Sequence, residues 1–136
     1  MRGGFGALAY GIGWLSGTPP GEALSTIVTG SRTAAAGAGV QSITGAGFVP
    51  RAAIAIGSGT SGSALVASWG LLDDASAERV CLLSVTLVTD AANLIHISDG
   101  VNAMTAVAVL TADGLDLTWS KGAAGIDAIF SILFLA

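Results

Sequence analysis

The chain has 136 residues, of which 52% are hydrophobic and only 10% are charged, and its formal net charge is −4. This length is typical of a single domain with a sizeable core. The five Lys and Arg residues form no basic stripe, so the composition gives no support for nucleic-acid binding. A surface this poor in charge is typical of a subunit that buries part of it in an assembly, and we expect a homo-oligomer.

The first part of the chain differs from the rest in composition. We predict a flexible, Gly-rich N-terminal arm at residues 1–23, followed by a domain at residues 24–136. Glycines and a Pro-Pro-Gly sequence at 19–21 oppose regular structure in this region. Phe5, Tyr10 and Trp14 are candidate anchors with which the arm orders on a neighbouring subunit, and a disordered leader is the alternative. Neither this region nor the apolar tail at 128–136 has the pattern of a membrane span, so we expect no membrane insertion.

From residue 24 onward, short runs of alternating apolar and polar residues are separated by turn signals, which is typical of antiparallel strands. No stretch predicts a convincing helix. We therefore predict an all-β fold, an antiparallel, jelly-roll-like β-sandwich with eight to nine strands. The predicted strands are residues 25–29, 40–44, 52–56, 64–72, 79–88, 94–97, 102–111, 115–120 and 126–135.

The strongest local signal is Asp113-Gly114, which lies between two apolar runs. It predicts a β-hairpin, because both residues tolerate the positive φ that tight hairpin turns need. After this turn, Leu115, Leu117 and Trp119 fall on one face of the next strand. This alternation predicts that Trp119 is a core anchor.

Residues with potential chemistry do not form a known catalytic or metal-binding pattern. The single cysteine, Cys81, lies in an apolar run and is expected to be a small buried side chain. The single histidine, His96, has no nucleophile or carboxylate motif beside it. We interpret the acidic stretch Asp73–Glu78 as a solvated connection rather than a calcium site. The sequence therefore predicts no enzyme activity, no cofactor and no metal.

A carbohydrate-binding module is an alternative interpretation, because loops of a sandwich can build shallow sugar sites from aromatic rings and carboxylates. Tryptophans in strands usually pack in the core, so we expect both candidate tryptophans to be buried. A hydrolase built on the two adjacent aspartates is disfavoured, since neighbouring strand residues point to opposite faces. The candidate sugar-binding residues are Trp69, Trp119, Asp73, Asp74 and Asp116.

Two motifs carry a resemblance to a known family. Residues 44–52 read TGAGFVPRA and residues 112–119 read ADGLDLTW. They resemble the opening GF-x-P-K/R-A strand and the A-D-G-F-x-L-x-W hairpin of a β-sandwich domain found in tailed-bacteriophage virion proteins of the minor tail or fibre type. Leu115 departs from this pattern, because the family has an aromatic residue there. The residues that carry the resemblance are Phe48, Pro50, Asp113, Gly114 and Trp119.

The resemblance covers Val40–Ala136 and implies a non-enzymatic structural protein of the phage particle. Its expected partners are other virion proteins and copies of itself, with a trimer as the expected oligomer. A tail or fibre location is the main expectation, and a capsid decoration protein that stabilises the head is the alternative. The carbohydrate-binding alternative implies a host-surface glycan as a further partner.

Overall fold

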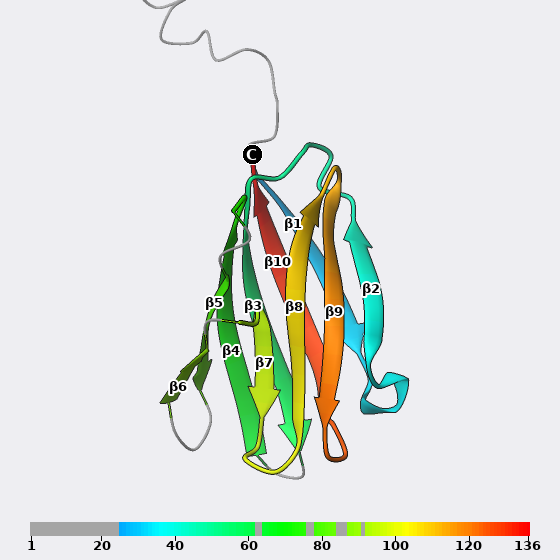
Figure 1. Ribbon diagram of the computed structural model, residues 1–136, viewed down its shortest axis with the longest axis vertical. Helices are drawn as coiled ribbons and strands as arrows, with labels where there is room; N and C mark the ends of the chain where they lie inside the picture. Colours follow the sequence, from blue (N-terminus) through cyan, green and yellow to red (C-terminus); the bar gives the residue numbers. More distant parts are fainter. Residues whose placement is uncertain (1–24, 62–63, 76–77, 84–86, 91) are drawn as a thin grey trace, which may run out of the picture.

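The computed structural model describes residues 25–61, 64–75, 78–83, 87–90 and 92–136. The predicted arm, with Phe5, Tyr10 and Trp14, lies outside the described residues. The described residues form ten strands and one short 3₁₀ helix, η1 (Ala34–Ala36) (Figure 1). Within the described ranges, no helix has the length and apolar character needed to cross a membrane. The strands are β1 (Ser25–Arg32), β2 (Gly39–Thr44), β3 (Ala52–Ser61), β4 (Ala64–Asp73), β5 (Glu78–Leu83), β6 (Leu87–Asp90), β7 (Ile95–Ser98), β8 (Ala103–Thr111), β9 (Gly114–Gly122) and β10 (Asp127–Leu135).

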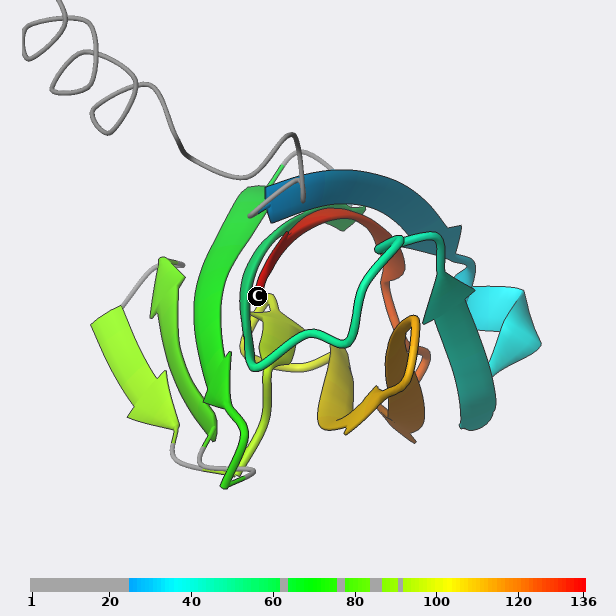
Figure 2. The same cartoon turned by 90° about the horizontal axis from the view of Figure 1, so that it is seen from above.

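The strands form two antiparallel sheets that pack against each other. The six-stranded sheet has the order β1-β10-β3-β4-β5-β6, and the four-stranded sheet has the order β2-β9-β8-β7. The first strand pairs with the last and the second with the last but one, as in a jelly roll, and hairpins extend each sheet from there. Figure 2 shows both sheets curving around the core, with β6 at the far end of the larger sheet. The structure thus confirms the predicted all-β antiparallel sandwich.

One predicted strand is two strands in the structure. The apolar run at 79–88 was expected to form a single central strand, but it forms the antiparallel pair β5 and β6, in which Leu83 is opposite Leu87. The described residues therefore hold one strand more than the nine expected, and β6 is an edge strand rather than a central one. The prediction failed because the run has no Gly or Pro to mark a turn, and one long strand and two short ones then look alike.

Trp119 occupies the core between the sheets, where the strand alternation places it. Its side chain is 1% exposed, and its ring lies 5.7 Å from that of Phe130 on the opposite sheet, at an interplanar angle of 42°. Trp119 Nε1 donates a hydrogen bond of 2.9 Å to Gln41 Oε1, and Gln41 Nε2 donates one of 3.1 Å to the carbonyl oxygen of Ser31. This chain of contacts connects β9, β2 and β1 and satisfies the indole N–H at the core boundary.

A buried carboxylate connects the sheets at another place. Glu78, at the start of β5, is only 5% exposed, and its Oε1 accepts a 2.9 Å hydrogen bond from the backbone N–H of Ala108 in β8. The prediction that the acidic stretch is solvated throughout is therefore wrong for Glu78. A buried strand N–H without a partner in its own sheet must be satisfied elsewhere, and this side chain supplies the acceptor.

The inner faces of β3 and β4 carry small residues where β7 packs against them. A Cβ atom on Gly70 would lie 1.7 Å from the carbonyl oxygen of Leu94, and one on Gly59 would lie 2.8 Å from Ile97 Cγ2. Ser68 is buried at the same surface, with 1% of its area exposed. The close approach of the two sheets therefore excludes large side chains here, and Ile56, Trp69 and Leu71 face outward, whereas Val66 and Leu72 of β4 are buried in the core.

Gly70→Ala tests this close approach. We expect the substitution to lower the free energy of unfolding by about 3 kcal/mol or more, because the new methyl group overlaps a backbone oxygen that cannot move alone. The measurement is urea unfolding followed by circular dichroism. Gly122→Ala is the control, since its Cβ would meet only Ala103, at 3.5 Å from Cβ and 3.9 Å from the backbone nitrogen. An equal loss of stability in both variants would contradict the argument.

Candidate functional site

The two motifs singled out in the sequence contact each other at one end of the sandwich. Asp113 Oδ1 accepts a 2.7 Å hydrogen bond from the N–H of Gly47, and Oδ2 accepts one of 3.2 Å from that of Gly45. The carbonyl oxygen of Asp113 also accepts from the N–H groups of Gly45 and Ala46, at 3.0 and 3.1 Å. These bonds fix the β8–β9 hairpin to the β2–β3 connection, which crosses between the sheets (Figure 2).

The hairpin at this position differs in detail from the predicted turn. Thr111 is opposite Gly114 in the register, so the two turn residues are Ala112 and Asp113. Asp113 does not have the positive φ that the sequence argument assumed; among the described non-glycine residues only Ala123 has it. Gly114 itself has a φ of 157°, and a Cβ there would also lie 1.9 Å from the carbonyl oxygen of Ile43. The glycine allows β2 to approach the hairpin closely.

The first motif leads from this contact to the start of β3. Phe48 is half-buried against the core and Pro50 is buried. Arg51 donates from its backbone N–H to the carbonyl oxygen of Leu135 at 2.8 Å, and its guanidinium forms an exposed ion pair with Asp74, 2.7 Å from Nη2 to Oδ2. The hydrogen bond and the charge of Asp74 raise the pKa of Arg51. The motif therefore has a structural role and ends where β3 enters the larger sheet.

The outer face of the six-stranded sheet carries a group of apolar side chains from four strands. The register aligns Ile27, Leu133, Ile54 and Leu71 in one row from β1 to β4. In the next row Ile56 lies beside Trp69, and Ser131 and Thr29 continue the row on β10 and β1. On these four strands both rows lack charged side chains. We call this surface the outer apolar face, defined by Ile27, Ile54, Ile56, Trp69, Leu71, Ile129 and Leu133.

Several side chains of the outer apolar face are largely accessible to solvent. Ile27 and Ile129 are 67% and 66% exposed, Leu71 and Ile56 are 54% and 52% exposed, and Trp69 is 42% exposed. An antiparallel sheet with one solvated face normally alternates apolar and polar residues. This sheet carries large apolar side chains on both faces, which is typical of a sheet with a second layer packed on it.

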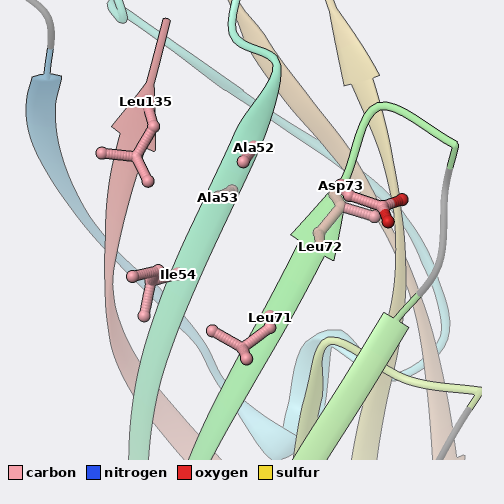
Figure 3. A pocket seen from close by; sticks show the side chains of 7 residues that line it. All are labelled: Ala52, Ala53, Ile54, Leu71, Leu72, Asp73 and Leu135. Carbon is pink, nitrogen blue, oxygen red and sulfur yellow. The ribbon is translucent and has the colours of Figure 1, made fainter.

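A hollow of about 460 Å³ lies at one end of the outer apolar face (Figure 3). Ala52 lies between Leu135 and Asp73 in the register. Its side chain is a single methyl group, so the larger side chains around it enclose an open space. Asp73 is the only charged residue of the lining. We call this pocket the Ala52 hollow; its lining residues are Ala52, Ala53, Ile54, Leu71, Leu72, Asp73 and Leu135.

The outer face of the four-stranded sheet has a different character. Serine and threonine alternate there with exposed Val40, Val107 and Val109. Asp116 lies on this face and accepts a 2.6 Å hydrogen bond from Ser42 Oγ. His96 is half-buried opposite Thr105. Among the described residues, no group of three or more His, Cys, Asp or Glu side chains could hold a metal ion.

The structure does not bring the candidate sugar-binding residues together. Trp119 is in the core, Asp116 is on the smaller sheet, and Asp74 pairs with Arg51. Trp69 and Asp73 do share the outer face of β4, but four residues along a strand separate them by about 13 Å. Asp73 Oδ1 accepts a 3.0 Å hydrogen bond from the N–H of Ala75.

The expectation that Trp69 packs in the core is wrong. Alternation along β4 places Trp69 and Leu71 on one face and Ser68 and Gly70 on the other, and the close approach of β7 selects the small residues for the interior. The sequence contains a signal that sequence reasoning missed. In residues 127–135, Ile129, Leu133 and Leu135 lie on the face opposite the buried Phe130 and Phe134, and apolar side chains on both faces are typical of a strand covered on both sides.

The remaining predicted residues occupy ordinary positions. The Ser98-Asp99-Gly100 segment forms the expected turn, in which Asp99 Oδ1 accepts from the N–H groups of Val101 and Asn102 at 2.9 and 2.6 Å. Cys81 lies in β5 opposite Trp69 in the register.

The chain was compared with family models, with curated proteins and with solved structures, and it matches none of them.

The two tryptophans are predicted to differ in their contribution to stability. Trp119→Ala should lower the free energy of unfolding by about 3–5 kcal/mol, because it leaves a cavity in the core and removes a partner of Gln41. Trp69→Ala should cost about 1 kcal/mol or less, because its side chain is already partly solvated. Urea unfolding of both variants provides the comparison. A larger loss for Trp69→Ala would show that Trp69 belongs to the core after all.

Proposed function

We propose that this protein is a non-enzymatic structural subunit of a tailed-bacteriophage particle. It is associated with the tail or fibre and assembles through the outer apolar face and the N-terminal arm. The observation that carries the proposal is the exposed outer apolar face, because soluble monomers rarely expose a contiguous apolar surface of this kind. Covering it with another protein layer removes apolar area from water and so stabilises the assembly.

The two motifs that resemble the phage domain support this setting. Residues 44–52 and 112–119 form a structural contact, with Asp113 bound to Gly45 and Gly47, rather than a catalytic one. The carboxylate and carbonyl group of Asp113 and the backbone N–H groups of Gly45, Ala46 and Gly47 are engaged in holding the sandwich together. The remaining prominent surface is the apolar one, which is suited to association.

The expected partners are copies of the same chain and other virion proteins. A subunit that uses one surface to bind a different surface on its neighbour forms a ring when the rotation closes, and a trimer is the form that we propose. Such an assembly buries the exposed side chains of the outer apolar face and leaves the outer face of the smaller sheet, with its serine and threonine side chains, to solvent.

One observation favours a second candidate function, a carbohydrate-binding module for host attachment. Trp69 is exposed on a sheet face, where an indole ring can stack on the apolar side of a sugar. A glycan array probed with the wild-type chain and with Trp69→Ala tests this candidate. Binding that depends on Trp69 would favour it over assembly as the role of this face.

Self-association should depend on the outer apolar face. We expect Leu71→Lys to raise the dissociation constant at least about tenfold, because a charge would have to be desolvated in the interface. Sedimentation velocity over a range of concentrations provides the measurement and the number of copies. Val109→Lys on the other sheet is the control, since Val109 and Leu71 are 55% and 54% exposed. A wild-type chain that remains monomeric, or an equal effect of both substitutions, would contradict assembly through this face.

The location in the particle is tested by labelling purified virions of the phage that encodes the chain with a gold-conjugated antibody. Label at the tail or fibre is the expected result. Label spread over the head would replace this location with that of a decoration protein, and particles without label would refute the virion proposal.

A further inference from the structure

The described part of the chain begins next to the Ala52 hollow. Ser25, the first residue of β1, is opposite Leu135 of β10, and Leu135 is opposite Ala52 of β3. Two strand spacings separate Ser25 from Ala52, which is about 10 Å. The N-terminal arm is therefore attached at the end of the outer apolar face that contains the hollow.

The arm and the outer apolar face are chemically matched. Residues 3–21 contain no charged side chain, and Phe5, Tyr10 and Trp14 are spaced along them. The hollow is lined by alanine, leucine and isoleucine, with Asp73 as its one charged residue. An aromatic side chain in an apolar pocket is the usual form of an energetically dominant interface contact.

The direction of β1 favours the face of a neighbouring copy over the subunit's own face. β1 runs from Ser25 toward the opposite end of the sheet (Figure 1), so the backbone at Ser25 enters the sheet from beyond its end. Contact of the arm with its own outer apolar face requires a reversal of the chain, whereas a neighbour that lies beyond this end can be reached without one. The eleven residues from Trp14 to Ser25 can span up to about 36–40 Å when extended, which is enough to reach the next subunit.

We infer that the arm of one copy docks on the outer apolar face of a neighbouring copy, with Phe5, Tyr10 or Trp14 seated in its Ala52 hollow. This inference rests on the proposed homo-oligomer and specifies which surface receives the arm. It makes the Ala52 hollow the docking site for an aromatic side chain from a second copy of the same chain.

Disulfide trapping between full-length chains tests the inference. In a Cys81→Ser background, Gly6→Cys, Gly11→Cys and Leu15→Cys, which leave the three aromatic side chains in place, are each mixed with a second chain that carries Ala52→Cys. The control partner carries Thr118→Cys, an exposed position on the other sheet. We expect at least one arm position to form a covalent heterodimer with position 52 at least about tenfold faster than with position 118, because docking raises the effective concentration of the two thiols. Mild oxidation and non-reducing electrophoresis measure the rates.

Three results would overturn the inference. Equal rates at positions 52 and 118 would mean undirected collisions. The absence of a heterodimer while the wild-type chain sediments as an oligomer would overturn the docking site and leave the proposed function intact. An intramolecular disulfide in a chain that carries both cysteines, without heterodimers in the mixtures, would mean that the arm covers its own face. If the wild-type chain sediments as a monomer, the proposed assembly itself is refuted.

Discussion

The close approach of β7 to the larger sheet determines which side of that sheet becomes the interior. Gly57 and Gly59 of β3 and Ser68 and Gly70 of β4 face β7, and a side chain at Gly70 would overlap the carbonyl oxygen of Leu94. Strand residues alternate between faces, so this single constraint also fixes the positions of their neighbours. Ile56, Trp69 and Leu71 are placed outside because the interior at that level has no volume for them.

The exposed apolar face is thus a consequence of how the core is packed. The core obtains its bulk from β9 and β10, where Trp119 contacts Phe130, and from β7 itself. Where β7 packs on them, β3 and β4 contribute glycine and serine inward and Ile56, Trp69 and Leu71 outward, although Val66 and Leu72 of β4 also lie in the core. A subunit built this way has apolar surface on both sides of one sheet, and covering the second side requires material from outside the sandwich.

The fold was largely predictable from the sequence, whereas the orientation of one strand was not. Period-two alternation after Asp113-Gly114 correctly placed Leu115, Leu117 and Trp119 in the core, because that strand is polar on its other face. In β4 the same alternation was ambiguous, since Trp69 and its neighbours are apolar on one side and small on the other. Which side is buried depends on contacts with β7 that are distant in the sequence, and the turn between β5 and β6 lacked the residues that usually mark one.

The motif at 44–52 connects the two parts of the molecule that matter for this interpretation. At one end its glycines bind Asp113 and close the sandwich, and at the other end Ala52 lines the hollow on the outer apolar face. A larger residue at position 52 would fill the hollow without disturbing the contact of Asp113 with Gly45 and Gly47, because position 52 and these glycines lie at opposite ends of the segment. The resemblance to a phage domain and the candidate docking site therefore meet in one segment, but they depend on different residues of it. Closure of the fold and the shape of the hollow can therefore vary independently along this segment.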